Sequence, residues 1–148
     1  MDPTAEFTAL LAEHRDRIYR ICCCYVADRE ERDDVHQMAL IHLWQGMKSF
    51  RGASSPGTWV YRVVVNTCLG HARSEQRRQR RLAEAEHQPA LWAAEPVAAD
   101  EPGGGAGAVE RLYACVHKLP PGERAVVSLY LEEASTNQIA EVLGMSEG

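Results

Sequence analysis

The 148-residue sequence predicts an all-helical protein with two small domains joined by a flexible linker. Apolar residues recur every three or four positions in several segments, which is the spacing of amphipathic helices. Between two such regions lies a stretch with three prolines, a glycine cluster and no basic residue, which is typical of a linker. We therefore expect a first domain over residues 1–81, an acidic linker over 82–109 and a second domain over 110–148.

The first domain begins with two predicted helices. The first has a charged outer face, and its apolar face carries Phe7, Leu10, Leu11, Ile18, Ile21 and Tyr25. The second is expected to start in "DREERDD", because acidic side chains stabilise a helix N-terminus. It has two apolar stripes, one with Val35 and Met38 and one with Leu43 and Trp44. A single core contact needs less apolar surface than these two stripes provide. This helix is therefore either central in the domain or a docking surface.

A third helix is expected after the loop "FRGASSP", with Ser55 as the N-cap and Pro56 at the first helical position. One side of this helix combines planar donors and amide edges with cations. Side chains that contact DNA bases and phosphates directly require this combination. Phe50 and Trp59 lie beside this stripe, and they are either able to stack on an unpaired base or part of the core. The stripe consists of Thr58, Arg62, Asn66, Leu69, Arg73 and Arg77.

The net charge of −5 hides a strong asymmetry along the chain. Residues 51–81 carry seven basic side chains and one acidic side chain, whereas residues 82–110 carry six acidic side chains and no basic one. A basic block inside an acidic protein indicates a local contact with a polyanion. The alternative is a solvated helix end, where arginines interact favourably with the helix dipole.

The second domain contains the pattern of a helix-turn-helix. "LPPGE" separates its first two helices, and Ser135 with Gln138 forms a capping box for a third, which Gly144 ends. Ser146 is positioned to cap a fourth helix, the recognition helix, but the sequence stops two residues later. We therefore expect this domain to lack its recognition helix and to be poorly packed. Its first helix has an apolar stripe of Val109, Leu112 and Val116.

The five cysteines do not form a disulfide framework. Cys22, Cys23 and Cys24 are contiguous, and neighbouring Cα atoms about 3.8 Å apart are too close for an easy disulfide. We expect buried core thiols, with a redox or metal sensor as the alternative. No phosphate loop or spaced catalytic set is present, so we expect no enzyme, cofactor, metal or small-molecule substrate. No apolar run reaches the roughly 20 residues of a membrane span, so we expect a cytoplasmic protein.

Several motifs occur in the order of one known family: "DDVHQMALIHLW", "FRGASSPGTWVYRVVVNTC", an arginine-rich helix end, a linker, and "LPPGERAVVSLYLEEASTNQIAEVLGMS". The chain resembles the bacterial RNA polymerase sigma factors of the extracytoplasmic-function group, in the sigma-70 family. The resemblance covers nearly the whole chain outside the linker. It implies a transcription initiation factor that binds core RNA polymerase, directs it to promoters and helps to melt the minus-ten element. In the family, the fourth helix, which we expect this chain to lack, reads the minus-thirty-five element.

The resemblance also assigns a polymerase-binding surface. In the family, an Asp-x-x-Gln followed by an aromatic residue docks on the clamp helices of the polymerase's largest subunit. Polar or acidic residues commonly follow the Gln in the family, whereas an apolar pair follows it here. The implied polymerase-binding residues are Asp34, Gln37, Met38, Ile41 and Trp44.

The loop from Phe50 to Pro56 matches the family segment that receives a base flipped from the minus-ten element, and the following helix matches the one that reads this element. The implied DNA-binding residues are Phe50, Arg51, Ser54, Ser55, Thr58, Trp59, Arg62, Asn66, Arg73 and Arg77. The family also implies an anti-sigma factor as a partner, often a membrane-anchored one. The remaining alternative, a one-component helix-turn-helix regulator, would not use the Asp34 surface.

Overall fold

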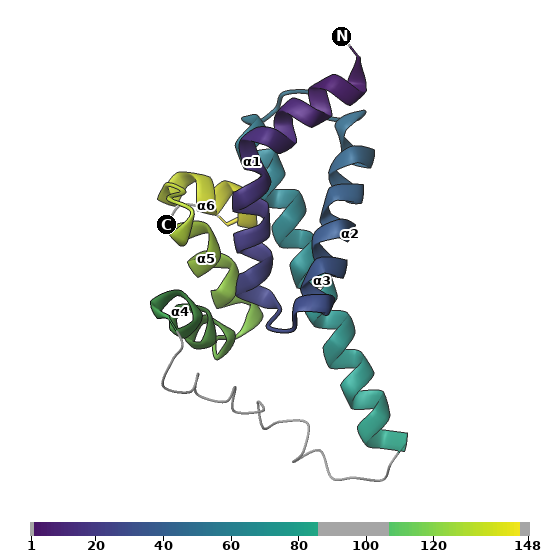
Figure 1. Cartoon of the computed structure of the whole chain (residues 1–148), viewed down its shortest axis with the longest axis vertical. Helices are drawn as coiled ribbons and strands as arrows, with labels where there is room; N and C mark the ends of the chain where they lie inside the picture. Colours follow the sequence, from purple (N-terminus) through teal and green to yellow (C-terminus); the bar gives the residue numbers. More distant parts are fainter. Residues whose placement is uncertain (1, 86–106, 146–148) are drawn as a thin grey trace.

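The computed structural model describes residues 2–85 and 107–145, which form helices and no strand, so the predicted all-helical class is confirmed. Most of the predicted linker lies outside the described residues, as does Ser146, the expected cap of a fourth helix. Figure 1 shows the helices in chain order. They are α1 (Pro3–Tyr25), α2 (Arg29–Met47), α3 (Pro56–Ala85), α4 (Ala108–His117), α5 (Pro121–Leu131) and α6 (Thr136–Leu143).

Side-chain caps start four of the helices. Asp2, Asp28, Ser55 and Ser135 each accept a backbone N–H from the first turn, over distances of 2.9–3.2 Å. Each contact satisfies one of the backbone donors that a helix N-terminus leaves unpaired. At the end of α6, Gly144 has a φ of 67°, a left-handed conformation in which glycine has no steric penalty. The predicted caps at residues 55 and 135 and the predicted end at 144 are therefore confirmed.

The first three helices form an N-terminal module around one apolar core. Val35, Ala39 and Leu43 recur every four residues on α2 and are each 3% exposed or less, so one stripe of α2 faces α1 and α3. The predicted core thiols are confirmed for Cys22, Cys23, Cys24 and Cys68, which are all buried, but the prediction is wrong for Cys115, which is exposed. Burial raises the pKa of the Cys24 thiol to about 12, so this thiol is protonated at neutral pH.

The C-terminal module, α4 to α6, packs directly on α1 and α3, on the side away from α2 (Figure 1). Its buried residues form one cluster with the core of the N-terminal module. The Arg20 guanidinium donates two hydrogen bonds to the Glu132 carboxylate, at 2.7 and 2.8 Å. His117 Nε2 lies 2.7 Å from the Cys23 carbonyl oxygen and donates to it. The sequence predicts two domains and a linker, but not this contact between the domains.

Helix α4 is rotated relative to its predicted orientation. Val116 is buried, but Val109 and Leu112 are 59% and 43% exposed, so the predicted apolar stripe is wrong for these two residues. The reason is that α4 packs through Tyr113, Val116 and His117, whose spacing of three and four residues forms a different face.

The last part of α3 extends past the ends of α1 and α2 (Figure 1). The helix continues to Ala85, four residues into the segment predicted as linker. In the described ranges, no helix is both long and apolar enough to cross a membrane.

Candidate polymerase and nucleic-acid interface

Five side chains on one side of α2 form an exposed surface, which we call the docking face. Asp34 and Gln37 are exposed, and Met38, Ile41 and Trp44 are 51%, 52% and 38% exposed. Their spacing of three and four residues places all five on adjacent turns of one helix side. A contiguous apolar patch with a carboxylate and an amide beside it is typical of a surface that binds another protein. The structure thus brings together the five residues that the sequence analysis selected.

Two contacts hold the docking face in position. The buried stripe of α2 packs against α1 and α3. This packing fixes the rotation of the helix, so the docking face points to solvent. At the far end of the face, the Trp44 ring meets Phe7 of α1 edge-on, with centroids 5.1 Å apart and planes at 71°. Such aromatic pairs contribute about 0.5–1.5 kcal/mol beyond their buried area. Trp44 is therefore partly exposed and also positioned.

The two aromatic residues of the predicted base-stacking site stack on each other. The Phe50 and Trp59 rings are nearly parallel, with centroids 5.0 Å apart and planes at 29°, and both side chains are half-buried. A Cβ atom at Gly46 would lie 3.1 Å from the Trp59 ring, so a glycine there allows the ring to approach α2 closely. Because the two rings cover each other's inner faces, an unpaired base can stack between them only if one of the rings moves.

The beginning of the polar stripe on α3 is covered by α6. Thr58 is only 3% exposed, contrary to its predicted place on an exposed stripe. Its hydroxyl oxygen accepts hydrogen bonds from Ser55 at 2.8 Å and from the Gln138 side chain at 3.0 Å. Arg62 donates to the Glu141 carbonyl oxygen at 3.0 Å. Gln138 therefore contacts α3 instead of completing the reciprocal half of its predicted capping box.

The rest of the polar stripe is open to solvent. Asn66, Arg73 and Arg77 are exposed and span about 16 Å along α3 at 1.5 Å per residue. Arg78 lies on the same extension and contacts Glu75 at 3.4 Å. In the loop before α3, Arg51 is exposed, Ser54 is half-buried and Ser55 serves as the N-cap of the helix. The polar stripe is thus divided into a covered part and an exposed, basic part.

The contact between the modules has a charged centre that sequence reasoning missed. The Glu132 side chain is 5% exposed, and the Arg20 side chain is 47% exposed. Their hydrogen bonds raise the pKa of the Arg20 guanidinium above its ordinary value. Nearby, burial lowers the pKa of His117, so its ring is neutral at neutral pH. No local pattern marks these contacts of Glu132 and Gln138, because their partners are 112 and 80 residues away.

Two family models match the chain, and their limits agree with the two modules. The model described as Sigma-70 region 2 matches residues 10–78, and the model described as Sigma-70, region 4 matches residues 109–148. The chain belongs to the sigma-70 family, in its extracytoplasmic-function group. It is therefore a promoter-directing transcription initiation factor, a class that binds core RNA polymerase and promoter DNA.

Curated relatives match the chain over different lengths. The ECF RNA polymerase sigma-E factor of Haemophilus influenzae is 29% identical over 148 residues, covering 96% of this chain and 78% of that protein. The ECF RNA polymerase sigma factor SigW of Bacillus subtilis is 26% identical, with 96% and 79% covered. The RNA polymerase sigma-H factor of Pseudomonas aeruginosa is 33% identical over 72 residues, and this match spans only 37% of that protein.

Proposed function

We propose that the chain binds core RNA polymerase through the docking face of α2. The observation that supports this most directly is the arrangement of α2. Asp34, Gln37 and three exposed apolar side chains lie on one side of the helix, and the stripe on the opposite side is buried. Burying these apolar groups against a partner helix supplies binding free energy. The carboxylate and the amide fix the orientation through hydrogen bonds.

We also propose that the loop and α3 read the promoter minus-ten element. In this proposal Phe50 and Trp59 receive a base, Arg62 and Asn66 contact base edges, and the exposed end of α3 contacts phosphates. One DNA stacking step is worth about 1.4 kcal/mol, and one captured base returns roughly 1–3 kcal/mol. Capture of one base therefore offsets one or two steps, so melting several base pairs requires the polymerase as well.

The packing of the modules adds an order of events to this proposal. We call the described arrangement closed, because α6 covers Thr58 and contacts Arg62 at the start of the reading helix. The docking face lies on α2, which the C-terminal module does not contact. The closed chain is therefore able to dock on polymerase, whereas base reading by Arg62 requires that the C-terminal module first leave α3.

The remaining parts of the proposal concern regulation and location. The exposed Met38, Ile41 and Trp44 side chains fit an anti-sigma factor that competes with polymerase for the docking face. We place the chain in the cytoplasm, where polymerase and DNA are found. We assign it no enzymatic reaction, because binding and positioning account for the docking face and the reading helix.

The proposal is tested by co-elution of the full chain with core RNA polymerase, which needs no promoter sequence. We expect the wild type to co-elute and the double variant Asp34→Ala, Gln37→Ala to elute separately. A matched control is Asp16→Ala, Gln76→Ala, which makes the same changes at exposed positions of α1 and α3. Equal co-elution of the docking-face variant, with an unchanged circular dichroism melt, would reject the docking assignment and favour a one-component regulator.

A further inference from the structure

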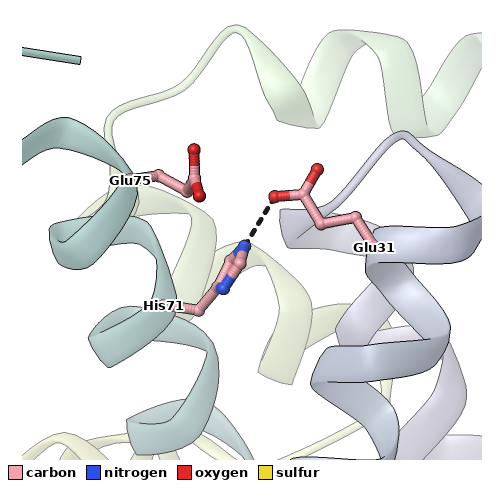
Figure 2. Close-up of side chains that lie close together, drawn as sticks. All are labelled: Glu31, His71 and Glu75. Atoms are coloured by element: carbon pink, nitrogen blue, oxygen red, sulfur yellow. Dashed lines mark hydrogen bonds and ion pairs between the residues drawn. The ribbon is translucent and has the colours of Figure 1, made fainter. Parts of the chain in front are cut away.

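Three potential metal ligands converge between α2 and α3, outside the docking face and the reading stripe. Glu31 lies in the first turn of α2, and His71 and Glu75 lie on consecutive turns of α3. One ligand atom from each side chain lies within 4.8 Å of the other two. Figure 2 shows the His71 ring nitrogen directed at the Glu31 carboxylate, with the Glu75 carboxylate on the other side of the gap.

The backbone around these side chains explains why they meet. His71 and Glu75 are four residues apart, so they lie one above the other on the same side of α3. The Glu31 N–H donates to the Asp28 cap at 2.9 Å, which fixes the first turn of α2. One turn further, Val35 is 3% exposed and holds α2 against the core. Both helices thus present the three side chains from positions that the fold determines.

The donor set has the chemistry of an open metal site. One imidazole nitrogen and two carboxylate oxygens suit zinc and similar divalent ions, and three protein ligands leave a fourth position for water. Bonds of about 2.0–2.2 Å place tetrahedral ligand atoms about 3.4 Å apart. His71 Nε2 and Glu31 Oε1 are 2.7 Å apart, and the widest separation allowed by the cluster is 4.8 Å. These separations must therefore change by about 1.4 Å or less to reach the bonded geometry.

An ion can reach this position from solvent. The His71, Glu31 and Glu75 side chains are 28%, 41% and 32% exposed. They line one end of a groove of about 860 Å³, which has room for a hydrated ion. Arg78 also lines the groove and contacts Glu75 at 3.4 Å, so an ion must displace this contact. Ion pairs as exposed as this one contribute little, so the displacement is a small obstacle.

We propose that Glu31, His71 and Glu75 bind one divalent ion of the zinc type, with water as the fourth ligand. The ion takes the place of the hydrogen bond between His71 Nε2 and Glu31 Oε1, and the neutral His71 ring that ligates the ion through Nε2 carries its proton on Nδ1. The bound ion connects the first turn of α2 to the middle of α3, one turn before Asp34 of the docking face. The proposal does not depend on the function proposed above, since none of the three ligands belongs to the docking or reading residues.

The test uses the full chain with the substitution Cys115→Ser, because Cys115 is an exposed thiol that would itself bind the probe. After treatment with a chelator, the protein is titrated with Co²⁺, whose absorption spectrum reports the ligands, and then with Zn²⁺ in competition. We expect one equivalent of Co²⁺ to bind and Zn²⁺ to displace it. The variants His71→Ala and Glu75→Gln should each weaken binding by more than about 100-fold, since loss of an outer partner alone costs 10–100-fold.

The matched control is His42→Ala, which removes another histidine from the same groove without removing a proposed ligand. Glu75→Gln nearly preserves the shape of a half-buried side chain, and circular dichroism checks that both ligand variants fold. In addition, Zn²⁺ should raise the thermal midpoint of the parent protein but not that of Glu75→Gln. The proposal is overturned if both ligand variants bind Co²⁺ like the parent, if only His42→Ala loses binding, or if the parent shows no saturable binding.

Discussion

Removal of the Arg20 side chain should shift the chain from the closed to an open arrangement. Arg20→Ala leaves the Glu132 carboxylate, which is 5% exposed, without its bidentate partner. Loss of one member of a fully buried pair costs about 3–5 kcal/mol. Since Arg20 is 47% exposed, water can partly replace it, and we expect about 2–3 kcal/mol. This free energy corresponds to a closed-to-open ratio that is about 30- to 150-fold lower.

Thiol labelling measures this ratio. The pKa of Tyr113 is raised by burial and by the nearby Cys23 and Cys24, which places these two α1 thiols next to the C-terminal module. Opening should expose both thiols, so their labelling rate in a Cys115→Ser background, followed by mass spectrometry, should rise by the same 30- to 150-fold. The reasoning is refuted if Arg20→Ala changes this rate by less than about twofold.

Two further variants separate the salt bridge from general effects. Arg15→Ala removes an arginine that is 77% exposed and lies 4.0 Å from Asp16, so it should leave the labelling rate unchanged. Adding Glu132→Leu to Arg20→Ala removes the unpaired buried carboxylate as well, and the rate should fall back toward the parent value.

Three other predictions concern single groups. Trp44→Ala should weaken co-elution with core polymerase and cost about 2–4 kcal/mol in a denaturant melt, because it removes both the edge-on ring pair with Phe7 and the area that the partly buried ring covers. Burial lowers the pKa values of His14, His36 and His117 below 6.5, so these histidines take up protons on unfolding. Stability should therefore start to fall as the pH drops through 6.5 and continue to fall to the folded-state pKa values, and His117→Gln should reduce this loss in thermal melts at pH 7 and 5. Only Cys115 among the cysteines is exposed, so a thiol reagent should titrate one fast thiol in the native chain and none after Cys115→Ser.

The elements of the fold were predictable where they depend on neighbouring residues. The Ser55 and Ser135 caps act over three residues, and the apolar stripes repeat every turn, so both leave a pattern in the sequence. The surplus apolar surface of α2 was predictable for the same reason, but the residues of the docking face were implied by the family resemblance. Each of the two stripes expected from spacing combines a buried residue with an exposed one. Trp44 is the clearest example, because it is partly exposed beside the fully buried Leu43.

The contact between the modules was not predictable, because it depends on residues that are distant along the chain. Thr58 matches the exposed stripe by spacing, and only its hydrogen bond with Gln138, 80 residues away, shows that it is covered. Similarly, Val109 and Leu112 fit a helix stripe as well as Tyr113 and Val116 do. The choice between the two faces is made by the surface of α1 on which α4 packs.

The stacked Phe50 and Trp59 rings have a consequence for how a promoter base would be selected. A base that takes the place of one ring against the other exchanges one stacking contact for another. The aromatic pair is worth about 0.5–1.5 kcal/mol and a base on an aromatic ring about 1–3 kcal/mol, so the net gain is small. Every base has a stacking surface, and the exchange is thus nearly indifferent to base identity. Discrimination among the four bases would then depend on hydrogen-bonding groups at the rim of the site.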